Sequence, residues 1–160
     1  MNDKTGKILA VTGAHANVGK TSLALRLVSI LPGAVFVKVG HGEKKPDMDN
    51  IFYHTGTPFG RIVSENSAAP FLVIESNSVL KEVTPECVIY LPGEGRKKSS
   101  ATLAEKKADL VRGRRTDLST LRLLSEKLGL SQARVLEIID AAGALPPVEL
   151  NNGEDKNDTV

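Results

Sequence analysis

The sequence contains no tryptophan and a single cysteine, and only 4% of its 160 residues are aromatic. One cysteine excludes an internal disulfide, and it does not make a zinc site with three histidines at unrelated spacings. Few aromatic side chains leave few platforms on which single-stranded nucleic acid could stack. No apolar run approaches the roughly 20 residues that span a bilayer. These absences argue against a disulfide scaffold, a zinc module and an integral membrane protein.

The charge balance gives no sign of a polyanionic partner. The chain has 21 basic and 19 acidic residues, and a net charge of +2 is too small to predict binding to nucleic acid or to an anionic membrane. With 41% hydrophobic and 25% charged residues, the composition is that of a globular protein. The first residues show no secretory hydrophobic region, and the lone cysteine suits a reducing compartment, so we expect a cytoplasmic protein.

Short apolar runs alternate with helical stretches along most of the chain, and this alternation predicts an α/β protein. Buried strands are predicted at residues 8–12, 34–39, 71–74 and 87–91, and a further short strand at 61–64. A leucine-rich helix is predicted at 21–31 and a polar loop at 40–56. We therefore expect a mostly parallel sheet with helices on both faces, ending near Val111.

The pattern changes in the last third of the chain. Residues 116–128 and 131–142 each have the spacing of a short amphipathic helix. The polar segment 147–160 is expected to be disordered. The sequence thus predicts three parts, which are a sheet domain at 1–111, a small helix-turn-helix-like pair at 112–146 and a polar tail.

The most informative segment runs from residue 14 to residue 21 and reads AHANVGKT. It follows a predicted strand, opens a predicted helix and fits the P-loop pattern G-x-x-x-x-G-K-[ST], except that Ala14 takes the place of the first glycine. In such a loop, backbone N–H groups and the helix N-terminus bind phosphate. The candidate nucleotide-binding residues are His15, Ala16, Asn17, Val18, Gly19, Lys20, Thr21 and Ser22.

Three of these positions have a specific chemical role in a P-loop. Gly19 lets the backbone approach the phosphates closely. Lys20 would reach the β and γ oxygens and is a candidate catalytic residue, and the Thr21 hydroxyl would bind Mg²⁺. The side chain of His15 is expected to point to solvent, because the loop binds through its backbone. The segment predicts a P-loop NTPase-like fold that binds a nucleoside triphosphate.

Glu75 directly follows the predicted strand at 71–74. A P-loop needs an acidic group at the end of a neighbouring strand to orient Mg²⁺, so Glu75 is the second candidate catalytic residue and a candidate metal-orienting residue. A guanine-reading Asn-Lys-x-Asp motif is absent, and the residues alone leave GTP and ATP both open.

Two further stretches accompany the P-loop. Residues 37–41 (VKVGH), 45–49 (KPDMD) and 53–57 (YHTGT) form the first, and residues 72–77 (LVIESN) form the second. Together with the P-loop they resemble the MobB family, the P-loop proteins of molybdopterin-guanine dinucleotide biosynthesis. The first stretch is similar to that family's strand ending in Lys-His, its Asp-containing loop and its Ala-Gly-Ala-like close. The second resembles its strand ending in Glu-Gly.

The resemblance implies a Mg²⁺-dependent GTP-binding protein with weak intrinsic hydrolysis. It also implies a homodimer that assists the attachment of a guanine nucleotide to molybdopterin, working with a molybdopterin-handling partner protein. By the same resemblance, Asp49 is a candidate metal ligand and His41 a candidate nucleotide-binding residue. For His41, a loop histidine that caps a turn is the alternative reading.

Two other functions stay open. One is a nucleotide-responsive regulator whose C-terminal helices bind DNA or a partner protein. Gln132 and Arg134 stand beside Glu137 and Asp140 on the second helix, which is a poor composition for contacting nucleic-acid phosphates. The other is a small-molecule kinase that uses Asp49 or Glu75 as the base.

Overall fold

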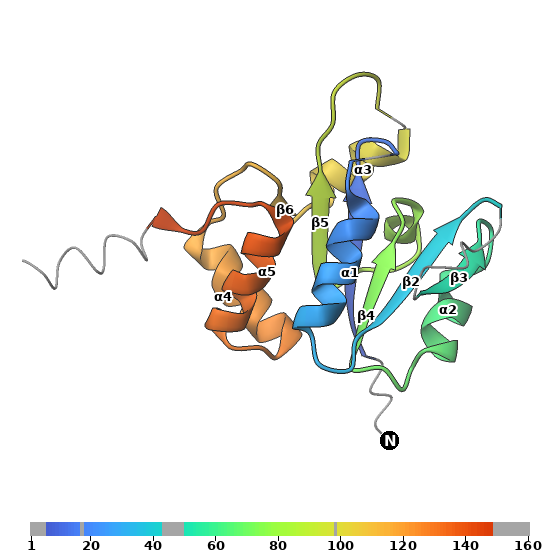
Figure 1. Cartoon of the computed structure of the whole chain (residues 1–160), viewed down its shortest axis with the longest axis horizontal. Helices are drawn as coiled ribbons and strands as arrows, with labels where there is room; N and C mark the ends of the chain where they lie inside the picture. The colour runs from blue at the N-terminus through green and yellow to red at the C-terminus, as the bar shows by residue number, and fades with distance from the viewer. Residues whose placement is uncertain (1–5, 17, 43–49, 98, 149–160) are drawn as a thin grey trace, which may run out of the picture.

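The computed structural model describes residues 6–16, 18–42, 50–97 and 99–148, and its strands form one six-stranded sheet (Figure 1). The order across the sheet is β3-β2-β4-β1-β5-β6, and each neighbouring pair runs parallel. The strands are β1 (Lys7–Gly13), β2 (Val35–Gly40), β3 (Ile51–His54), β4 (Phe71–Glu75), β5 (Cys87–Leu91) and β6 (Leu110–Val111). The expected α/β fold with a parallel sheet is therefore confirmed.

Helices cover both faces of the sheet (Figure 1). The helices are α1 (Lys20–Ile30), α2 (Phe59–Glu65), α3 (Ser99–Lys107), α4 (Leu118–Leu128) and α5 (Gln132–Ala142), with a short 3-10 helix η1 (Ser78–Lys81). Alternation along β1 divides the core, because Leu9 and Val11 pack with α1, α4 and α5, whereas Ile8 and Ala10 pack with α2, η1 and α3. Both faces of the central strand are therefore buried, which explains its nearly continuous apolar sequence.

Two predictions between residues 40 and 65 are wrong. The segment predicted as a strand at 61–64 lies inside helix α2, whose Phe59 and Ile62 are buried three residues apart on one side of the helix. The stretch predicted as a polar loop contains β3, which pairs with β2 from Val37↔Ile51 to Gly40↔His54. Residues 43–49 of that stretch lie outside the described residues.

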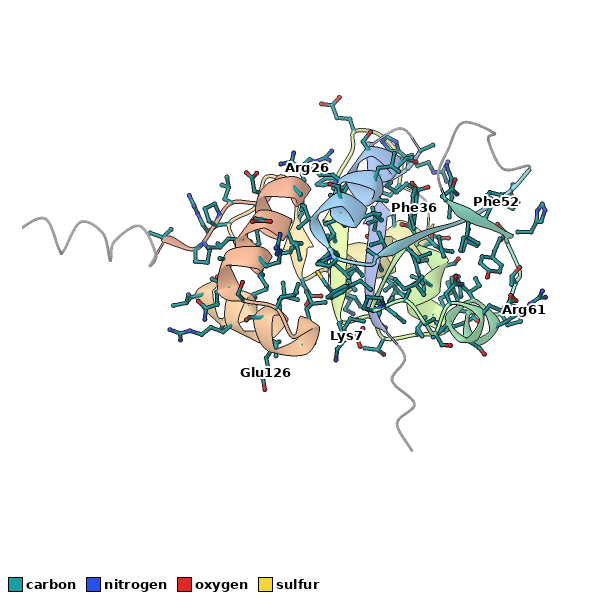
Figure 2. All side chains as sticks on the ribbon, turned by 60° about the horizontal axis from the view of Figure 1, so that its bottom comes forward. Lys7, Arg26, Phe36, Phe52, Arg61 and Glu126 are labelled. Atoms are coloured by element: carbon teal, nitrogen blue, oxygen red, sulfur yellow. The ribbon has the colours of Figure 1, made fainter. Side chains whose placement is uncertain are left out.

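The last two helices share the core of the sheet. Leu121 of α4 and Ile138 of α5 belong to the same buried cluster as Leu27 of α1. On the surface, Arg26 of α1, labelled in Figure 2, donates to Asp140 of α5 at 3.3 Å. That these helices form a separate unit after residue 111 stays a prediction. Residues 149–160 of the predicted tail lie outside the described residues, and no helix among the described ones has the length and apolarity to cross a membrane.

The parallel sheet brings five chain segments to one edge. Because all strands point the same way, the segments that follow β1, β2, β4, β5 and β6 emerge side by side. They include the predicted P-loop, His41, Glu75, the loop that begins at Pro92, and Arg112. Any site built from these residues lies at the carboxyl edge of the sheet, where open α/β proteins bind their ligands.

Candidate phosphate-binding site

The entrance to the predicted P-loop is held by Asn77. The Gly13 N–H donates to Asn77 Oδ1 at 2.9 Å, and Asn77 Nδ2 donates back to the Gly13 carbonyl at 2.8 Å. On the other side, the Ala14 N–H donates to the Leu91 carbonyl at 3.0 Å. The chain therefore leaves β1 in a fixed direction. Sequence reasoning assigned no role to Asn77, whose only signal is its place two residues beyond Glu75.

The loop ends at Gly19, the residue that precedes α1. Gly19 has a φ of 97°, a left-handed conformation that glycine adopts without steric cost. No side chain caps this end of α1, and its first turn carries no acidic residue. The first N–H groups of a helix have no intrahelical acceptor, and the helix dipole makes them a favourable anion site. The N-terminus of α1 is therefore a candidate anion-binding site.

Glu75 lies at the centre of a short polar cluster. Thr21 Oγ1 donates to Glu75 Oε1 at 2.6 Å, and Lys38 Nζ lies 3.4 Å from Glu75 Oε2. The sheet register explains both contacts, because Glu75 pairs with Val11 just before the loop and with Lys38 on β2. The Glu75 side chain is only 7% exposed, so its charge needs a partner, and Lys38 supplies it.

A cavity of about 600 Å³ opens beside this cluster, within the range of small-ligand sites. Its walls come from α1, β2, β4 and the loop, and are formed by Ala16, Gly19, Lys20, Thr21, Ser22, Lys38, Val39, Gly40, His41 and Glu75. The structure thus gathers seven of the predicted site residues around one space. The structure adds Lys38 to the site. The sequence analysis noted the segment 37–41 that contains Lys38 but gave this residue no role.

His15 and Val18 lie on the other side of the loop and are not among the described residues that line the cavity. His15 Nε2 lies 2.7 Å from the Glu94 carbonyl oxygen, and its Nδ1 lies 2.9 Å from that of Ala16. A Cβ on Gly93 would stand only 2.5 Å from His15 Nε2, so this close packing requires a glycine there. The His15 ring joins the P-loop to the loop after β5. Asn17 and Asp49 lie outside the described residues.

Arg112 also contacts the loop. It follows β6, and its Nη1 donates to the Val18 carbonyl at 2.8 Å. The sequence analysis gave Arg112 no part in this site. No local pattern could have found this contact, because it joins residues 94 positions apart in the chain.

The oxygen atoms of Thr21 and Glu75 suit Mg²⁺. This ion prefers hard oxygen ligands, takes few of them from the protein and completes its shell with phosphate oxygens and water. Within the described residues, no group of three or more His, Cys, Asp or Glu side chains could hold a metal ion by itself. One hydroxyl and one carboxylate therefore fit Mg²⁺ that arrives with a polyphosphate, and they do not fit a zinc site.

Three titratable groups whose pKa burial raises are not among the described residues that line this cavity. Burial raises the pKa of the Cys87 thiol well above its ordinary value, which leaves it protonated and unreactive. Burial likewise raises the pKa of Tyr90 and that of Asp109, whose Oδ2 accepts from the Val88 N–H at 2.7 Å. The charged groups among the cavity residues are Lys20, Lys38 and Glu75, accompanied by the polar side chains of Thr21, Ser22 and His41.

The fold and the cavity define an α/β protein of the P-loop NTPase-like type. No protein-family model matches the chain, and a search of curated proteins found no significant match. The class therefore rests on the parallel sheet, the loop between β1 and α1, and the residues around the cavity.

Proposed function

We propose that the chain binds a nucleoside triphosphate together with Mg²⁺, with the phosphates held by residues 14–21. The observation that carries this proposal is the 2.6 Å hydrogen bond from Thr21 Oγ1 to Glu75 Oε1. It places the hydroxyl that would bind the metal directly beside the carboxylate that would orient its water ligands. If Gly-Lys-Thr occurred by chance at a strand-to-helix turn, a hydrogen bond between its threonine and a carboxylate at the end of a neighbouring strand would not be expected.

The charges around the cavity support the same ligand. Lys20 and Lys38 both line it, and the N-terminus of α1 adds the positive end of its dipole. Against these stands one carboxylate among the described residues of the wall, that of Glu75. A polyphosphate with a bound divalent cation complements this balance better than a neutral or cationic ligand does.

For the biological role, we propose GTP as the preferred nucleotide and assistance in molybdopterin-guanine dinucleotide biosynthesis. The support is the resemblance to the MobB family at the P-loop, at the strand that carries Lys38 and His41, and at the strand that ends in Glu75. Residues of all three segments line the same cavity. Weak GTP hydrolysis, a homodimer, a molybdopterin-handling partner and a cytoplasmic location are parts of the same proposal.

Isothermal titration calorimetry tests the proposal directly. GTP, ATP, GDP and ADP are titrated into the purified chain with MgCl₂ in excess over the nucleotide, and again with EDTA. We expect binding of the triphosphates that tightens with Mg²⁺, and tighter binding of GTP than of ATP. Tighter binding of ATP than of GTP would contradict the guanine-nucleotide role but would agree with triphosphate binding by the P-loop. If none of the four nucleotides binds, both triphosphate binding and the guanine-nucleotide role are wrong.

A further inference from the structure

Arg112 contacts the predicted P-loop (residues 14–21, below called the phosphate loop) from the flank opposite to Glu75. Its Nη1 donates to the Val18 carbonyl, and its terminal nitrogens lie 3.5 Å from the point where a Cβ on Gly19 would stand. The Val18 carbonyl and the Gly19 N–H belong to one trans peptide, so they point in opposite directions. By holding this carbonyl, Arg112 also fixes the orientation of the Gly19 N–H in the same peptide.

The same side chain contacts the end of helix α5. Arg112 Cγ lies 3.1 Å, and its Nε 3.4 Å, from the position of a Cβ on Gly143, the residue that ends α5. The backbone joins the two segments as well, because the Gly113 N–H donates to the Gly143 carbonyl at 2.8 Å. The stem of Arg112 therefore packs against Gly143 while its guanidinium holds the loop.

Helix α5 is in turn fixed against α1. Ile138 and Ile139 are buried in the cluster that contains Leu23 and Leu27 of α1. A chain of contacts thus runs from the body of α1 through α5 and Arg112 back to the loop that opens α1. The docking of α5 sets the place of Gly143, and Gly143 limits where Arg112 can lie.

We propose that Arg112 is a positioning residue that couples the docking of α5 to the affinity of the phosphate loop for a nucleoside triphosphate. This inference rests on the proposed function. Coupling between two sites is reciprocal, so a bound triphosphate also strengthens the docking of α5. The C-terminal helices then act on the nucleotide site without touching the nucleotide.

Two glycines provide a matched test. Gly143 ends α5 with a φ of 76°, and Gly129 ends α4 with a φ of 65°. A Cβ at Gly143 meets Arg112, whereas a Cβ at Gly129 meets nothing within 4 Å. Gly143→Ala and Gly129→Ala therefore introduce the same kind of backbone strain, and only the first disturbs Arg112. We expect Gly143→Ala to weaken Mg²⁺–GTP binding at least threefold relative to Gly129→Ala, with both proteins shown to be folded at the titration temperature.

Substitution of Arg112 tests the contact from the other end. Arg112→Gln should weaken Mg²⁺–GTP binding at least fivefold, and Arg112→Lys, which keeps a cationic donor, should recover part of the loss. Amide hydrogen exchange supplies a readout that a merely structural role would not move. GTP should slow exchange across residues 132–142 in the wild type and in Gly129→Ala, but not in Arg112→Gln.

The outcomes separate this inference from the proposed function. If the wild type binds no nucleotide, both are wrong. If it binds GTP and Lys20→Ala abolishes binding, while Gly143→Ala and Arg112→Gln bind like the wild type, only the coupling is overturned. If Arg112→Gln weakens binding but Gly143→Ala matches Gly129→Ala and α5 exchange ignores GTP, Arg112 contacts the nucleotide itself and the coupling is again overturned.

Discussion

The two flanks of the phosphate loop are built in different ways. The flank toward β4 and β2, here the carboxylate flank, consists of Thr21, Lys38 and Glu75, whose side chains contact one another. The flank toward β5 and β6, here the carbonyl flank, consists of His15, Val18, Glu94 and Arg112. There the side chains of His15 and Arg112 hold backbone carbonyl oxygens. One flank presents reactive groups to the cavity, and the other fixes the path of the chain.

This difference shows why the two flanks call for different experiments. Under the proposed function, charges and hydroxyl groups on the carboxylate flank contact the ligand and its metal ion, so their removal should change affinity and its metal dependence. Contacts on the carbonyl flank act on the loop, so their removal should change its conformation first. The four predictions below test this division, in order of the expected effect.

The largest effect is expected for Lys20→Ala. Lys20 lines the cavity between the two flanks, and its removal takes a positive charge from the phosphates. Triphosphate affinity should fall at least tenfold, or about 1.4 kcal/mol, as measured by calorimetry. Lys81→Ala, which changes an exposed residue of η1 outside the cavity, is the matched control and should bind like the wild type. Equal affinities of Lys20→Ala and the control would remove the P-loop assignment.

The second prediction concerns Glu75→Gln, which keeps an oxygen acceptor for Thr21 but removes the charge. Affinity in the presence of Mg²⁺ should fall roughly fivefold to tenfold, or about 1 to 1.4 kcal/mol, while affinity in EDTA stays nearly unchanged. Glu65→Gln, which removes an exposed carboxylate paired with Arg61 on α2, is the control. Equal losses of nucleotide affinity with and without Mg²⁺ would show that Glu75 has a structural role in the sheet and does not orient the metal ion.

The third prediction concerns the ion pair of the carboxylate flank. Lys38→Met leaves the buried Glu75 carboxylate without its cation and should lower the free energy of unfolding by about 1 kcal/mol, because Lys38 itself is 29% exposed. The double variant Lys38→Met/Glu75→Gln should recover most of this loss, since no buried charge is then left unpaired. Urea denaturation measures both. A double variant less stable than Lys38→Met would contradict the pairing.

The smallest effect is expected for Asp109→Asn, which lies on neither flank. Burial raises the pKa of Asp109 in the folded chain, so this group contributes stability below its unfolded pKa of about 4 and loses it as the pH rises through the folded value. Asp109→Asn should therefore be at least as stable as the wild type at pH 7, and this difference should disappear below about pH 4. Nucleotide affinity should not change, which separates stability from the site.

Sequence patterns predicted those parts of the molecule that depend on local chemistry. The apolar run before Ala14 and the one before Glu75 are strands because both of their faces are buried, as in β1 and β4. Glu75 was predicted as the metal-orienting carboxylate because a P-loop needs an acidic group at the end of a neighbouring strand, and the structure places Glu75 Oε1 2.6 Å from Thr21 Oγ1. The same reasoning missed β3, since Ile51 and Phe52 follow a polar stretch that gave no strand signal.

The remaining errors have physical causes as well. Arg61-Ile62-Val63 is rich in β-branched residues, but the spacing of Phe59 and Ile62 buries one side of a helix, and tertiary packing decided in favour of α2. The contacts of Asn77 with Gly13 and of Arg112 with Val18 depend on which strands are neighbours. Strand order is a property of the whole chain, so no motif could have predicted either contact.

The central position of β1 has a consequence for how the molecule is made. It pairs with β4 from Lys7↔Phe71 to Val11↔Glu75 and with β5 from Leu9↔Cys87 to Gly13↔Leu91. The strand therefore has no partner until β4 has been synthesised, and it is paired on both sides only after β5. At ordinary rates of translation, this delay is on the order of ten seconds. During it, an apolar strand waits unpaired, which is the kind of segment that chaperones bind. The phosphate loop acquires its flanks only when residues 75 and 112 have also emerged, so under the proposed function a nucleotide would stabilise the finished fold and would not guide its early steps.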